Sequence, residues 1–270
     1  MLETVKGLIL RETPIGDYDK IMTVLTAEHG KISVFARGAK RLKSPLFTPT
    51  QLFSYSEMTL YRSASTYYIR QGALVESFYH IRDTLEGAAL AGYLADVAAD
   101  VSQEEQKEEA LLRLILNCFY AIAGKIKPPE QIKAVFELRA AAEAGFRPDL
   151  VACAGCGKAA LETYYFDVSD GIFRCEDCFR AAQTEREAAA SRQSEADSIY
   201  HTGQLIALLS PSVFAAMRYT IYTRLKRIFA FELEDDALRD FASVCEKYLL
   251  CHLERNFSTL DFYRSVCSPI

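Results

Sequence analysis

The chain has 270 residues, half of them apolar and a quarter charged, an ordinary balance for a globular protein with room for more than one domain. Its net charge of −5 argues against a uniformly basic nucleic-acid binder, and no apolar run approaches the roughly 18 residues that a membrane-spanning helix requires. Charged residues at positions 3, 6, 11 and 12 interrupt any signal-peptide core, so we expect a cytoplasmic protein without a membrane partner.

Residues 1–80 have the pattern of a β domain. Five segments are rich in β-branched and aromatic residues, which favour strands: 4–10, 20–26, 31–37, 52–61 and 66–71. Turn signals separate the segments, and a longer gap follows the third. This pattern predicts a small closed barrel. An OB-type barrel has five strands, although an SH3-like barrel would fit the same pattern.

The third expected strand carries a candidate nucleic-acid site. A period of two places Ile32, Val34 and Ala36 on one face and Lys31, Ser33, Phe35 and Arg37 on the other. The segment from residue 31 to residue 43 holds five basic residues and no acidic one. Proteins that bind single strands combine cations along the phosphates with aromatic rings that stack on bases. The candidate DNA contacts are Lys31, Phe35, Arg37, Lys40, Arg41 and Lys43. A solvated strand edge followed by a flexible basic loop explains the pattern equally well.

From about residue 81 the apolar period becomes that of helices. Apolar stripes predict helices over about 90–101, 111–122, 130–142, 214–228 and 234–249. Ser210 followed by Pro211 is typical of a helix start, with the serine as the N-cap. Residues 183–197 are charged and rich in alanine, which favours an exposed helix or a linker.

Two C-x-x-C pairs predict a metal site. Cys153 and Cys156 form the first pair, and Cys175 and Cys178 form the second. The pattern of the segment between them predicts a β-hairpin, which would bring the second pair close to the first. A redox pair would need one C-x-x-C beside a βαβ unit, and a disulfide framework would need an oxidising compartment. We therefore expect one structural Zn²⁺, whose four-thiolate shell leaves no open position for chemistry. A zinc hydrolase would need such a position, so this class has little support.

Several segments together resemble the bacterial recombination mediator family RecO over nearly the whole chain. They are GDYDKI at 16–21, EHGKISV at 28–34, RGAKR at 37–41, FELR at 136–139, GFRPDL at 145–150 with the first cysteine pair, LLSP at 208–211 and FSTLDF at 257–262. The order and spacing of these segments are more specific than any one of them.

The resemblance implies an α+β protein with an N-terminal five-stranded OB-type β-barrel and a C-terminal helical domain that carries an inserted four-cysteine zinc module. The implied boundaries are 1–80 for the barrel, 81–150 and 183–270 for the two parts of the helical domain, and 151–182 for the zinc module.

The resemblance also implies a non-catalytic role in DNA repair and homologous recombination at the bacterial nucleoid. Members of the family bind single- and double-stranded DNA, anneal complementary strands and, with RecR, load RecA onto strands coated by single-stranded DNA-binding protein. The resemblance favours the basic segment as the DNA contact. Lys133 and Arg139 are weaker candidates for binding the acidic C-terminal tail of single-stranded DNA-binding protein.

Two expectations follow from charge and from the competing class of function. Residues 1–80 carry a net charge of +3, so the remaining residues carry −8. Phosphate neutralisation supplies much of DNA affinity, so we expect binding that needs RecR or falls steeply with salt. The alternative is a zinc-containing adaptor that binds proteins and has no annealing activity of its own.

Overall fold

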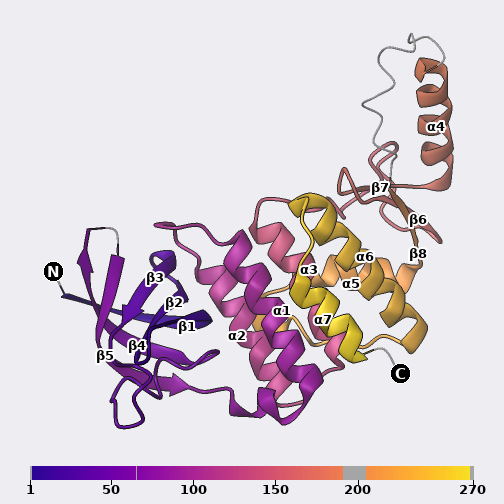
Figure 1. Ribbon diagram of the computed structural model, residues 1–270. Coiled ribbons are helices and arrows are strands. Elements are labelled where there is room, and N and C mark those ends of the chain that lie inside the picture. Colours follow the sequence, from indigo (N-terminus) through magenta and orange to yellow (C-terminus); the bar gives the residue numbers. More distant parts are fainter. Residues whose placement is uncertain (1, 65, 191–204, 268–270) are drawn as a thin grey trace. The chain divides into compact units, whose positions relative to one another are not determined.

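The computed structural model describes residues 2–64, 66–190 and 205–267 (Figure 1). The chain divides into two compact units. The first comprises Met1–Phe136 and Asn256–Ile270, and the second comprises Glu137–Arg255. The expected boundaries at residues 80, 150 and 182 stay predictions.

The first unit begins with a closed five-stranded barrel, which confirms the OB-type prediction. Its strands are β1 (Leu2–Ile15), β2 (Asp19–Thr26), β3 (Gly30–Ala36), β4 (Tyr55–Ser63) and β5 (Thr66–Glu76). Their order around the barrel is β1-β2-β3-β5-β4, and β1 closes it by pairing with β4. All neighbouring strands are antiparallel except β3 and β5, which run parallel. The five-strand count and closed topology correspond to an OB fold.

The barrel interior is filled mainly by every second side chain of each strand, because successive side chains point to opposite faces. Its buried cluster consists of Val5, Ile9, Met22, Val24, Ile32, Val34, Ala36, Ala39, Leu46, Met58, Leu60, Tyr67 and Ile69. Each Val, Leu, Ile or Met side chain among them contributes about 1.5–3 kcal/mol when it leaves water. The first strand is longer than expected, because it continues past Pro14, which faces Lys20 at the mouth of a tight hairpin.

Helices complete the first unit. They are η1 (Tyr79–Asp83), α1 (Leu85–Val101), α2 (Glu109–Ala123) and α7 (Ser258–Cys267), with the first residues of α3 (Pro129–Glu143). The stripe expected for α2 is buried from Leu111 to Ile122. The helix α7 returns against α1, where the Thr259 hydroxyl donates to the Asp96 carboxylate at 3.0 Å. The helix α7 was not predicted from the sequence.

The described part of the second unit contains a small sheet and further helices. Its elements are β6 (Tyr164–Asp167), β7 (Ile172–Arg174), α4 (Glu176–Ala190), β8 (Ile206–Leu209), α5 (Pro211–Tyr222), η3 (Leu225–Arg227) and α6 (Asp235–Leu253). The hairpin between the cysteine pairs is confirmed as β6 and β7. The strand β8 pairs with β6 and was not predicted. Of the expected exposed helix or linker at 183–197, residues 191–197 lie outside the described residues.

The helix expected over 214–228 ends earlier than the apolar stripe suggests. Ser210 is confirmed as the N-cap, since its hydroxyl accepts from the Val213 N–H. The helix α5 stops at Tyr222, because Thr223 takes an extended conformation (φ −79°, ψ 151°). The rest of the stripe therefore belongs to η3 and the chain after it. In the described ranges, no helix is both long and apolar enough to cross a bilayer.

Candidate nucleic-acid interface and metal centre

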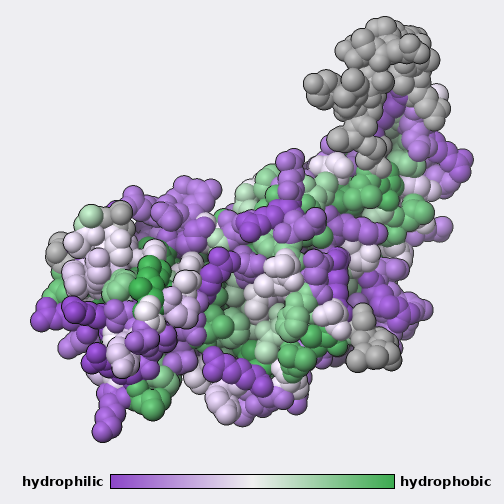
Figure 2. Space-filling view, in the orientation of Figure 1, coloured by the Kyte–Doolittle hydropathy of each residue, from purple (hydrophilic) through white to green (hydrophobic). Residues whose placement is uncertain are grey.

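The outer face of β3 carries the side chains that the alternation predicts. Ile32, Val34 and Ala36 are buried, whereas Phe35 is half-buried and Arg37 at the end of the strand is exposed. Hydrophilic side chains cover much of the barrel face visible in Figure 2, with smaller apolar areas between them. The barrel core thus fixes the strand, and the strand in turn presents an aromatic ring and a cation to solvent.

The loop after β3 is held against the β1–β2 turn. Gly38 has a φ of +64°, which reverses the chain, and its N–H donates to the Asp19 carboxylate at 2.7 Å. The Lys40 backbone N–H donates to the Tyr18 carbonyl at 2.9 Å, and its Nζ donates to the Gly16 carbonyl at 3.1 Å. The Arg41 guanidinium lies 4.6 Å from the centre of the Tyr18 ring, a cation–π contact. Two of the predicted DNA contacts therefore also fix the loop.

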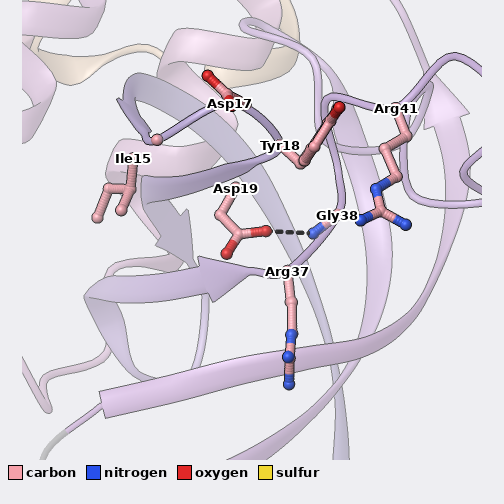
Figure 3. Close-up of a pocket in the computed structure, with 8 residues that line it drawn as sticks. Ile15, Asp17, Tyr18, Asp19, Arg37, Gly38 and Arg41 are labelled. Atoms are coloured by element: carbon pink, nitrogen blue, oxygen red, sulfur yellow. Dashed lines mark hydrogen bonds between the residues drawn. The ribbon is translucent and has the colours of Figure 1, made fainter.

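A pocket of about 610 Å³ lies between this turn and this loop. It is lined by Ile15, Gly16, Asp17, Tyr18, Asp19, Arg37, Gly38 and Arg41. Figure 3 shows the Asp19 carboxylate directed at the Gly38 N–H, with Arg37 extending away from Asp17. The pocket therefore combines two guanidinium groups with two carboxylates and an aromatic ring. Sequence reasoning identified Arg37 and Arg41 but not Tyr18, although GDYDKI was one of the segments that it singled out.

The predicted cations differ in how available they are. Lys31 is half-buried, and its Nζ donates to the Ala99 carbonyl at 2.6 Å, in the last turn of α1. A cation there also satisfies the negative end of the helix dipole. Among the described residues, the exposed Arg37 and Lys43 side chains have no hydrogen-bond or ion-pair partner. The structure thus leaves Arg37 and Lys43 as the freest cations of the basic segment.

The four cysteines form one cluster. Their sulfur atoms all lie within 4.8 Å of one another, and the Cys156 and Cys175 sulfurs are 3.7 Å apart. A tetrahedral ion with metal–sulfur bonds of about 2.3 Å requires sulfurs about 3.8 Å apart. Gly155 makes room for this packing, since a Cβ there would lie 2.8 Å from the Cys178 sulfur. The donor set therefore fits a single four-coordinate metal ion.

The electrostatics of the cluster also suit a cation. Burial would raise the pKa of the Cys153 thiol, but N–H groups around its sulfur, from Cys175 at 3.2 Å and Gly155 at 3.4 Å among them, lower that pKa to about 6. Hydrogen bonds with the Cys175 and Cys156 thiols raise the pKa of Cys178 to about 12. Four crowded thiolates repel one another, so a positive ion would stabilise full deprotonation.

Comparison with known proteins decides the family. The family models "Recombination protein O N terminal" and "Recombination protein O C terminal" match residues 1–78 and 82–194. A DNA repair protein RecO from Acetivibrio thermocellus is 31% identical over 260 residues, covering 96% of this chain and 95% of that protein. The chain belongs to the RecO family. Members named DNA repair protein RecO from Caldicellulosiruptor bescii and Symbiobacterium thermophilum are 27% and 28% identical over 97% of this chain.

The two residues that the RecO resemblance suggested for partner binding lie in α3 and have other contacts. Lys133 is only 4% exposed, with its Nζ 5.9 Å from the centre of the Tyr93 ring. The Arg139 guanidinium pairs with Glu143 at 2.9 Å and donates to the Thr220 carbonyl at 3.3 Å, near the end of α5. These side chains have clear structural roles, and their roles in partner binding stay predictions.

Proposed function

We propose that this RecO-family chain is a non-catalytic mediator of DNA repair and homologous recombination that binds DNA through the outer face of β3 and the loop after it. The observation that carries the proposal is the set of exposed cations, Arg37 and Lys43 above all, beside an aromatic ring on an OB barrel. OB-type barrels commonly bind oligonucleotides, and cations with aromatic rings are typical of single-strand sites.

The proposed activity is the pairing of complementary single strands, with double-stranded DNA as a second ligand. Two strands approach one another only when the repulsion between their phosphates is reduced and their bases remain accessible. A surface of cations reduces the phosphate repulsion without any covalent step, and an open barrel face leaves the bases accessible. The whole chain has a net charge of −5, whereas residues 1–80 have a net charge of +3. We therefore expect an affinity for DNA that falls steeply as the salt concentration rises.

The further partners that we propose are RecR, with which the protein would load RecA, and the acidic C-terminal tail of single-stranded DNA-binding protein. The proposed setting is the bacterial cytoplasm at the nucleoid. The metal ion that we propose is one structural Zn²⁺ held by Cys153, Cys156, Cys175 and Cys178. Their four thiolates would complete its tetrahedral shell, so the ion would stabilise the fold.

The test compares two double charge reversals in salt-titrated binding to fluorescent oligonucleotides. Arg37→Glu with Lys43→Glu removes the two cations of the site that have no partner within the described part of the chain. Arg113→Glu with Lys125→Glu makes the same change in net charge on exposed residues at α2 and just after it. We expect the first variant to lose about tenfold or more in single-strand affinity. Its salt slope should fall by about 1.4, since each phosphate contact contributes about 0.7.

Unchanged affinity and salt slope in the Arg37/Lys43 variant would exclude this surface as the DNA site. The same variants are then assayed for annealing of complementary labelled oligonucleotides, with and without RecR. Annealing should follow the loss of binding in the site variant and remain normal in the control. A protein that brings down RecR but never anneals strands, at any salt concentration, would instead be an adaptor.

A further inference from the structure

A row of apolar side chains runs across the outside of the barrel. Strand pairing aligns Leu2 of β1 with Tyr61 of β4, Tyr61 with Tyr68 of β5, Tyr68 with Phe35 of β3, and Phe35 with Ile21 of β2. None of the five is buried, and Leu2 and Tyr61 are 51% and 41% exposed. Strands separated in sequence thus contribute to one continuous exposed surface around Phe35.

The three rings at the centre of this row contact one another. The Tyr61 and Tyr68 rings are stacked, with centres 5.2 Å apart and planes 15° apart. The Phe35 ring is tilted against Tyr68 at 5.6 Å. The rings therefore hold one another in position, and Tyr61 remains accessible to solvent. A preorganised stack of this kind loses little side-chain entropy when a base adds to it.

The charges beside the row are asymmetric. Arg37 lies two residues beyond Phe35, and Arg70 lies two residues beyond Tyr68 on the parallel strand, so both belong to the same flank. Both are exposed, and neither side chain has a partner among the described residues. Toward the other end of the strands, Arg62 follows Tyr61 directly, so its side chain belongs to the opposite face, where it lies 5.4 Å from the centre of the Tyr67 ring and pairs with Glu105 at 2.9 Å. A polyanion would therefore follow the flank of Arg37 and Arg70.

We propose that Phe35, Tyr68 and Tyr61 form a base-stacking platform that makes this site select unpaired over double-stranded DNA. The inference rests on the proposed function and adds to it a preference for single-stranded over double-stranded DNA. Bases of a single strand are free to stack on protein rings, while their phosphates run past Arg37 and Arg70. Duplex bases already stack within the helix and cannot reach the rings. The platform therefore adds affinity for single strands alone, whereas the cations serve both forms.

The first experiment uses leucine variants, which keep the row apolar but remove the rings. Removing one base–aromatic stack typically costs roughly 5- to 150-fold in affinity. We expect Tyr61→Leu with Tyr68→Leu to lose at least about tenfold for an oligothymidylate and less than about twofold for a duplex of equal length. Tyr61→Phe with Tyr68→Phe keeps the rings and should retain the single-strand affinity of the unaltered protein. Normal duplex binding by the leucine variant shows that this variant is folded.

The second experiment uses fluorescence, since the chain contains no tryptophan. Tyr61→Trp places a single indole in the row, and Tyr79→Trp places one at an exposed position (67%) of η1, outside the row. Stacking on a base quenches indole emission. We expect oligothymidylate to quench the first variant strongly and the second hardly at all, with little quenching of either by duplex.

The outcomes separate the two proposals. Equal losses for single strands and duplex in the leucine variant, or no loss at all, would overturn the platform. Equal quenching of the Tyr61→Trp and Tyr79→Trp variants would do the same. If binding still depends on Arg37 and Lys43 in those cases, the proposed function stands. If the unaltered protein binds no DNA, with RecR present or absent, both proposals are overturned.

Discussion

The barrel surface and the cysteine cluster arrange their candidate functional groups in opposite ways. Arg37 and Lys43 are exposed and without partners among the described residues, whereas the four cysteine sulfurs all lie within 4.8 Å of one another, with Cys153 and Cys175 buried and Cys156 and Cys178 nearer the surface. Groups that would meet a long, mobile polyanion have to stay solvated and separate. Groups that would hold a metal ion must instead be gathered around one point. The difference teaches that one part of the chain suits binding and the other suits structural stability.

The largest effect should come from breaking the metal centre. Cys175→Ser removes one of four ligands, and metal binding to such a cluster is coupled to folding. We expect loss of nearly all bound metal and a lower melting temperature of the second unit, measured by elemental analysis and thermal unfolding. Cys267→Ser, at an exposed cysteine outside the cluster, is the matched control. Retention of one equivalent of metal by Cys175→Ser would contradict the assignment.

A smaller effect on the same centre should come from Gly155→Ala. The added Cβ would lie 2.8 Å from both the Cβ and the sulfur of Cys178, so a ligand must move. We expect metal affinity to fall at least about tenfold in competition with a chromophoric chelator. Gly157→Ala tests backbone strain alone, since φ is +76° there but nothing lies within 4 Å. Unchanged metal affinity in Gly155→Ala would contradict the argument that crowding of Cys178 matters.

The smallest effect should come from single arginines of the barrel. Arg70→Ala removes a cation that lies beside the aromatic rings and has no partner among the described residues, whereas Arg62→Ala removes one that is already paired with Glu105. We expect single-strand affinity to fall about three- to tenfold in the first variant, with a salt slope lower by about 0.7. The second variant should change affinity less than about twofold. A larger effect of Arg62→Ala than of Arg70→Ala in a salt titration would place the phosphates nearer to Arg62 and overturn the path past Arg70.

Local sequence determined much of the fold. Enrichment in β-branched and aromatic residues between turn signals located all five barrel strands, and a period of two oriented the third, because these properties do not depend on which strands become neighbours. The same argument applies to the cysteine pairs, since a C-x-x-C turn places two thiols together without help from distant residues. The cap at Ser210 is equally local. These features depend on residues within one turn or one strand of each other.

What local sequence could not determine is which segments meet. Phe35 was identified from its strand, but Tyr61 and Tyr68 join it only because β3 pairs with β5 and β5 with β4. Lys31 has the same local pattern as Arg37, yet its Nζ is bound to the Ala99 carbonyl, 68 residues away in the chain. The helix α7 and the strand β8 were missed for the same reason, since partners distant in sequence stabilise them.

The sequence by itself therefore determined the barrel strands, the basic segment and the four cysteines that cluster in this RecO-family protein. Only the tertiary structure decided which cations remain free and which aromatic rings stand beside them. The physical reason is that alternation and ligand spacing are properties of a few consecutive residues. Closure of a barrel instead depends on pairing between strands whose order the chain does not state locally.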